Sequence, residues 1–177
     1  MKRHRRTYLK WLHWSLLPLV VWFTLVQPRD IRPLGDAAFM FHSVLGLIFV
    51  TLALLWTADH LRHGLASRPG PKLTGWMRRL HRAMHLTLIW GLFCVAVSGF
   101  LLGLTSTVLL WAGGIVPIAP PLGLPRANDL VGKIHAAEFY LLAGLVGGHA
   151  MFHLWRHVHL RDNALRIMVP RLFHKYL

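Results

Sequence analysis

The chain has 177 residues, of which 55% are hydrophobic, and 20 Lys and Arg against 6 Asp and Glu give it a formal net charge of +14. Such an apolar composition excludes a disordered chain, and the single Cys excludes a disulfide framework or a metal site with two thiolates. In a soluble chain the charge would indicate nucleic-acid binding, but a membrane protein keeps apolar residues in lipid and basic residues in water. We therefore expect lipid contact and no nucleic-acid partner.

Four apolar segments follow one another along the chain. Each has about 20 residues, which at ~1.5 Å rise per residue crosses a hydrocarbon core of ~30 Å. We predict helices over residues 8–26, 37–58, 83–104 and 133–155. The first is not a cleavable signal peptide, because its apolar stretch is too long and no small-residue cleavage site follows it. The sequence predicts a single all-α domain over residues 1–177, an integral membrane four-helix bundle.

The connections between these segments differ in composition. Residues 26–36 are short and contain two prolines, and residues 59–82 are polar and basic. Residues 105–132 are apolar but rich in glycine and proline, which argues against a fifth crossing.

The basic residues predict the orientation of the chain in the membrane. The N-terminal segment, the connection 59–82 and the segment from Arg156 onward hold five, six and five Lys or Arg. The two other connections, together with the first residue of the last predicted helix, hold only Arg29, Arg32, Arg126 and Lys133. Since Lys and Arg collect on the cytoplasmic side of a membrane, we predict that both termini lie in the cytoplasm.

Histidines inside the apolar segments are the main functional signal, because ionisable side chains in a membrane are costly and usually functional. In the predicted topology His42 and His135 lie near the outer face, and His13 and His149 lie near the inner face. The fourteen residues from His135 to His149 return to within about 40° of one helix face, about 21 Å apart. Two such levels predict two stacked b-type haems, each iron bound by two neutral imidazoles. No Cys-x-x-Cys-His site exists, so both would be held without a covalent bond.

Several alternatives remain open at this point. The histidines can instead hydrogen-bond neighbouring helices or relay protons. His153 matches the face of His135 better than His149 does, but at about 27 Å it lies close to the headgroups. His85, with His81 one turn before it, is a candidate contact for a haem propionate or a quinone, or a replacement for His13. Glycines such as Gly148 allow either a flat macrocycle or a neighbouring helix to approach the backbone.

The chain resembles the bacterial cytochrome b561 family, small four-helix di-haem cytochromes related to the cytochrome b subunits of nickel-iron hydrogenases. The resemblance is carried by the His-x13-His spacing from His135 and the tail that follows it, by His13 beside Trp14, by His42 after Phe41, and by His85. It implies axial pairs of His42 with His135 outside and His13 with His149 inside, and so prefers His149 over His153.

The resemblance also implies electron transfer across a bacterial inner membrane between a periplasmic donor and the quinone pool. One branch of the family is similar to a superoxide oxidase, which passes electrons from superoxide to ubiquinone. In that case Arg156 and His157, together with His85, are candidate contacts for haem propionates or the quinone. The outer connections have a net charge of only +1, less than a collector of superoxide anions requires. The alternative functions are a membrane anchor that relays electrons for a periplasmic dehydrogenase or hydrogenase, and a helical membrane protein without haem.

Overall fold

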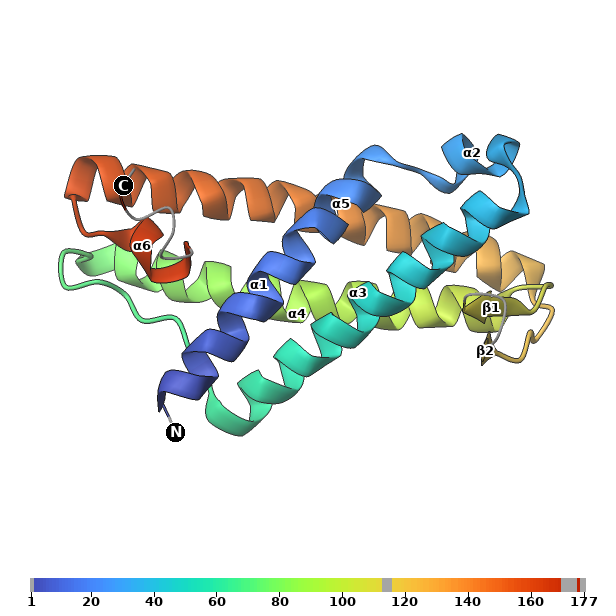
Figure 1. Ribbon diagram of the computed structural model, residues 1–177, viewed down its shortest axis with the longest axis horizontal. Coiled ribbons are helices and arrows are strands. Elements are labelled where there is room, and N and C mark those ends of the chain that lie inside the picture. Colours follow the sequence, from blue (N-terminus) through green and yellow to red (C-terminus); the bar gives the residue numbers. More distant parts are fainter. Residues whose placement is uncertain (1, 113–115, 170–174, 176–177) are drawn as a thin grey trace.

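The structure is a computed structural model that describes residues 2–112, 116–169 and 175. Four long helices form most of the fold: α1 (Lys2–Leu25), α3 (Asp36–His63), α4 (Gly75–Thr105) and α5 (Pro125–Trp155) (Figure 1). The shorter elements are α2 (Pro28–Ile31), a 3-10 turn (Arg32–Leu34), β1 (Leu110–Ala112), β2 (Val116–Ala119), a π-helical turn (Arg156–Leu160) and α6 (Ala164–Met168). The predicted all-α fold is confirmed, apart from one short β-hairpin.

Three of the described helices are long and apolar enough to cross a membrane: α3, α4, and α5 with its π-helical extension to Leu160. The chain therefore has the character of a membrane protein. Helix α1 does not reach the same apolar character, because Lys10, His13 and Pro18 lower its mean hydropathy. The fourth predicted crossing stays a prediction.

The long helices extend beyond the predicted boundaries. Helix α4 begins at Gly75, eight residues before its predicted start, and α5 is extended by the same amount. Helix α5 begins at Pro125, so His135 lies about three turns inside the helix instead of opening it. Proline suits the first turn of a helix, since its missing N–H would have no partner there. The Asn128 amide donates to the Leu102 carbonyl at 2.7 Å and to Thr105 Oγ1 at 3.0 Å, which attaches the start of α5 to the end of α4.

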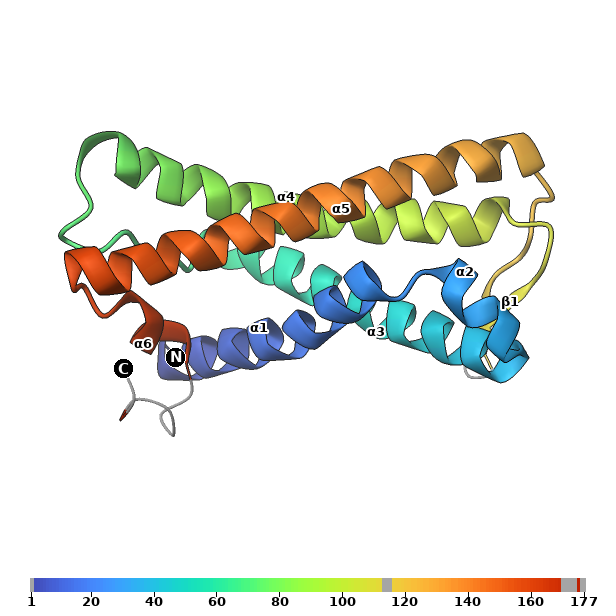
Figure 2. The ribbon, with the colours of Figure 1, turned by 90° about the horizontal axis from the view of Figure 1, so that it is seen from above.

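The helices form two layers. In both views α4 and α5 run side by side in opposite directions, and α1 and α3 cross them as a second layer (Figures 1 and 2). Buried apolar residues from all four helices meet at the crossing. They are Leu16, Leu19, Val20, Phe49, Ala53, Leu92, Val95, Ala96, Phe139 and Leu142.

The two ends of the bundle differ in charge. The start of α1, the connection 64–74 and α6 lie at one end, which holds the segments richest in Lys and Arg and is called the basic end below (Figure 1). Helix α2 and the hairpin lie at the opposite end. In the hairpin Trp111 pairs with Pro117 in antiparallel register. The sequence predicted an irregular connection here, and the Gly113-Gly114 pair that argued against a fifth crossing lies outside the described residues.

Candidate functional site

Five histidines from three helices gather toward the basic end of the bundle. They are His13 of α1, His81 and His85 of α4, and His149 and His153 of α5. The ring centroid of His149 lies 4.5 Å from that of His153, 4.9 Å from that of His85 and 6.5 Å from that of His13. We call these five residues the histidine cluster.

Helix geometry explains how the cluster forms. His81 and His85 are four residues apart, as are His149 and His153, and residues at this spacing share one face of a helix. Since α4 and α5 are antiparallel neighbours, the beginning of α4 meets the end of α5, and the two histidine pairs come together. The i,i+4 repetition was visible in the sequence, whereas the contact between the two pairs required the antiparallel packing.

The predicted inner pair, His13 and His149, is brought close together, with the ring planes tilted by 47°. An imidazole nitrogen lies roughly 2 Å from a coordinated metal, so two rings on opposite sides of one iron have centroids roughly 6 Å apart. The observed 6.5 Å is close to that spacing. The Nδ1 atoms of both rings are buried and have no hydrogen-bond partner within the described residues. The donor set of this pair therefore fits a haem iron.

Glycines beside His149 leave room for a bulky group. Gly144, Gly147 and Gly148 are exposed, and a Cβ added at any of them would meet no atom of the described residues within 4 Å, so none of the described helices packs closely on these positions. Of the two explanations that the sequence left open for these three glycines, close packing against a neighbouring helix is wrong. The open backbone beside His149 is compatible with a flat macrocycle.

The predicted outer pair, His42 and His135, is not in direct contact among the described residues. The indole N–H of Trp22 donates to Nδ1 of His42 at 3.3 Å, which places the proton of a neutral imidazole on Nε2. Phe23 packs against His42 at 4.8 Å between ring centroids and against Phe139 at 5.9 Å. Ligation through Nε2 of His42 would require Trp22 to release Nδ1. The outer pair thus fits a haem less directly than the inner pair does.

His135 is nevertheless held in a form suited to metal binding. The Ser98 hydroxyl donates to Oε2 of Glu138 at 2.6 Å, and Nδ1 of His135 lies 2.9 Å from Oγ of Ser98. Because the hydroxyl proton points to Glu138, the His135 N–H is the donor in the second bond, and Nε2 keeps a free lone pair. Chains of this kind orient metal-binding histidines and raise their basicity. A Cβ at Gly99 would lie 3.1 Å from Cε1 of His135, so the glycine allows this close approach.

A Ser98→Ala variant should weaken haem binding at His135. The alanine removes the acceptor that fixes the His135 tautomer, and such losses typically cost about 10- to 100-fold in metal affinity. Haem titration of the purified variant, followed by its absorption spectrum, measures this change. A Ser106→Ala variant, at the residue directly after the end of α4, is the control. Equal haem affinity in Ser98→Ala and the wild type would show that the hydrogen-bond chain has no influence on ligation.

Of the other candidate contacts, Arg156 is paired with a carboxylate of the chain itself. Its guanidinium donates to Oδ2 of Asp162 at 2.6 and 2.9 Å, and only 1% of the Arg156 side chain is exposed. It therefore ties α5 to the segment after the π-helical turn. His85 belongs to the histidine cluster, and His157 has a buried Nδ1 without a partner in the described part of the chain.

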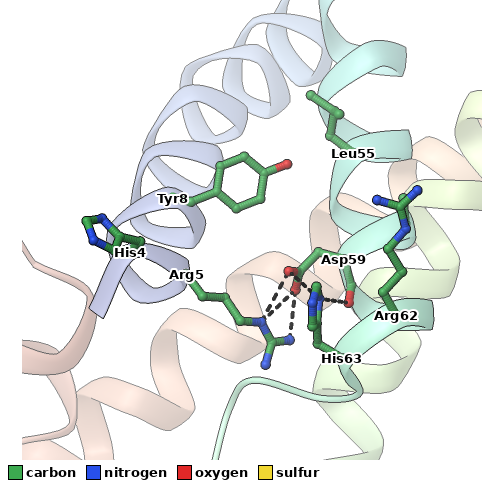
Figure 3. Close-up of a pocket in the computed structure, with 8 residues that line it drawn as sticks. His4, Arg5, Tyr8, Leu55, Asp59, Arg62 and His63 are labelled. Atoms are coloured by element: carbon green, nitrogen blue, oxygen red, sulfur yellow. Dashed lines mark hydrogen bonds and ion pairs between the residues drawn. The ribbon is translucent and has the colours of Figure 1, made fainter. Parts of the chain in front are cut away.

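A surface cavity that the sequence did not reveal lies between α1 and α3 at the basic end. Its volume is about 660 Å³, and Figure 3 shows its polar rim. The guanidinium of Arg5 forms a bidentate pair with Asp59, with contacts of 2.8 and 3.1 Å, and Nδ1 of His63 lies 3.1 Å from the same carboxylate. Leu55 and Ala58 add an apolar wall. The cavity combines the features that suit a molecule with one polar and one apolar part.

Comparison with known proteins gives no match to a protein-family model and none to a curated relative.

Proposed function

We propose that this chain is a multi-pass di-haem cytochrome b of the cytochrome b561 type, which carries electrons between a periplasmic donor and the quinone pool of a bacterial inner membrane. The observation that carries the proposal is the approach of His13 and His149, from α1 and α5, at 6.5 Å between ring centroids. In this proposal α1 crosses the membrane with α3, α4 and α5, and both termini lie in the cytoplasm. The basic end is then the cytoplasmic end.

Each proposed ligand has a defined task. Two non-covalent b haems would supply one-electron transfer when bound. His13 and His149 hold the inner group, and His42 and His135 hold the outer one. The Ser98–Glu138 chain orients His135, and Trp22 must turn away from His42 before that ring can ligate.

Ubiquinone is the proposed electron acceptor at the basic end. His157 lies there with an unpartnered Nδ1, which suits a donor to a quinone carbonyl. The cavity between α1 and α3 opens at the same end and has the mixed polarity of a quinone head with its tail. The donor on the opposite side is superoxide or a redox protein.

The first test is a spectrum of the protein expressed with haem supply and purified in detergent. We expect two low-spin b haems per chain by reduced-minus-oxidised difference and haem quantification. The purified protein should then reduce ubiquinone when superoxide is the only donor. A colourless preparation with no Soret band would contradict the proposal and favour a membrane protein without haem.

A second candidate function is a membrane anchor that relays electrons for a periplasmic dehydrogenase or hydrogenase. Exposed apolar side chains around the hairpin favour it, since Val108, Trp111, Val116 and Leu122 are 42% to 64% exposed at the end opposite the basic segments. Apolar surface of this kind often marks a protein contact. Co-purification with a large periplasmic subunit, together with no reduction of quinone by superoxide, would select this function over the first.

A further inference from the structure

We propose that His81, His85 and His153 form a binding site for one divalent transition-metal ion, with zinc as the best fit, separate from any haem. One nitrogen from each ring lies within 4.8 Å of those of the other two. None of the three is a proposed axial ligand of haem. The inference therefore does not depend on the proposed function.

The hydrogen bonds of the three rings leave suitable donor atoms free. The Nδ1–H of His85 donates to the His81 carbonyl at 2.7 Å, so Nε2 of His85 keeps its lone pair. Nε2 of His153 is buried and has no partner among the described residues. Nε2 of His81 bonds the Ser67 hydroxyl at 3.2 Å, whereas Nδ1 of His81 is buried without a described partner. Each ring thus offers one nitrogen without a hydrogen-bond partner among the described residues, and that nitrogen can bind a metal ion.

Burial makes these unused nitrogens informative. The His81 side chain is 0% exposed. A buried polar atom without a hydrogen bond costs roughly 1–3 kcal/mol, so several of them in one place indicate a missing ligand. A metal ion satisfies all three rings at once.

The chemistry of the donors selects the class of ion. Imidazole suits zinc, copper and nickel, whereas calcium and magnesium require oxygen ligands. The set contains no carboxylate, and the nearby Asp162 is paired with Arg156 at 2.6 Å. Zinc–nitrogen bonds of about 2.0–2.1 Å place the nitrogens of a tetrahedral site roughly 3.4 Å apart. The nitrogens lie within 4.8 Å of one another, so the side chains would have to move closer together to bind the ion.

The surroundings provide the support that metal sites require. The Ser67 hydroxyl and the His81 carbonyl hold two of the rings through their second nitrogen, as outer-shell partners do in known sites. Three protein ligands leave a fourth position for water or an anion. Because His81 and His85 belong to α4 and His153 to α5, a bound ion would also cross-link these helices.

The test is a zinc titration of the full chain, purified in detergent with an affinity tag that contains no histidine. We expect one Zn²⁺ per chain by elemental analysis, and a loss of affinity of at least 100-fold in His81→Gln, His85→Gln and His153→Gln. The matched control is His159→Gln, an exposed histidine outside the cluster, which should bind zinc as the wild type does. Ser67→Ala should weaken binding by about 10- to 100-fold.

The outcomes separate this site from haem ligation. Each variant is also assayed for haem content and thermal unfolding. If His81→Gln does not fold, His153→Gln and Ser67→Ala still decide the question. Unchanged zinc affinity in the folded variants overturns the proposal. An equal loss of zinc affinity in the control His159→Gln overturns it as well. If His153→Gln loses a haem and keeps its zinc, His153 is an axial ligand and the metal site is wrong. The zinc result stands even when the preparation contains no haem.

Discussion

A His149→Ala variant should contain one haem per chain instead of two, with the remaining haem spectrally unchanged. Alanine removes one of the two imidazoles whose centroids lie 6.5 Å apart, and His13 alone would leave the proposed haem iron without its second protein ligand. The reduced-minus-oxidised spectrum should lose one low-spin component, and haem quantification should fall by about half. In the proposed function each b haem would be held only by ligation and packing, so losing one ligand should remove most of its affinity.

The matched control for this prediction is His153→Ala. His153 lies one turn further along α5, and its ring centroid is 4.5 Å from that of His149, so both substitutions disturb the same region of the bundle. His13→Ala should reproduce the loss seen in His149→Ala. If His149→Ala keeps two low-spin haems and His153→Ala loses one, the inner ligand is His153.

An Asp162→Asn variant should be less stable than the wild type by about 3–5 kcal/mol, the usual cost of leaving one member of a buried ion pair without its partner. The exposed fractions of the Arg156 and Asp162 side chains are only 1% and 2%, so water cannot replace the lost charge. Asparagine still accepts the Ala164 N–H through Oδ1, which isolates the effect of the charge. The thermal unfolding midpoint in detergent measures the loss.

The control for the ion pair is Asp129→Asn at the opposite end of α5. Asp129 pairs with Lys133 at 2.6 Å, but their side chains are 66% and 73% exposed, and such pairs contribute about 0–1 kcal/mol. The double variant Arg156→Met/Asp162→Leu should regain much of the stability, because it leaves no unpaired buried charge. Equal midpoints for Asp162→Asn and Asp129→Asn would mean that the buried pair does not stabilise the bundle.

Local patterns in the sequence predicted the helices well, but not the contacts between them. Continuous apolar runs located the cores of α3, α4 and α5. The starts of α4 and α5 were missed by eight residues each, because the polar residues after Gly75 and Pro125 do not belong to the apolar runs. The apposition of His13 and His149 followed from depth in the predicted topology. The separation of His42 from His135 could not be predicted from their depth in the membrane. It depends on how the Phe23 side chain packs against His42 and Phe139.

Hydrogen bonds between distant segments were also beyond prediction. The bond of His135 to Ser98 joins residues 37 apart, and that of His81 to Ser67 joins a helix to a connection. Single serines give no signal in a sequence. The Arg156–Asp162 pair was close in sequence but required the π-helical turn and the positive φ of 47° at Arg161 to close.

The composition of α1 has a consequence for biosynthesis. This helix is less suited to lipid than α3, α4 or α5, and its buried face, with Leu9, Leu12, Leu16 and Leu19, finds apolar partners within the protein. We expect α1 to settle in the bilayer only when the later helices are there to receive it. If His13 completes the inner haem site, binding of that haem and packing of α1 against the other helices occur together. Cofactor loading would then act as a checkpoint on assembly, and chains starved of haem should be the ones that membrane proteases remove.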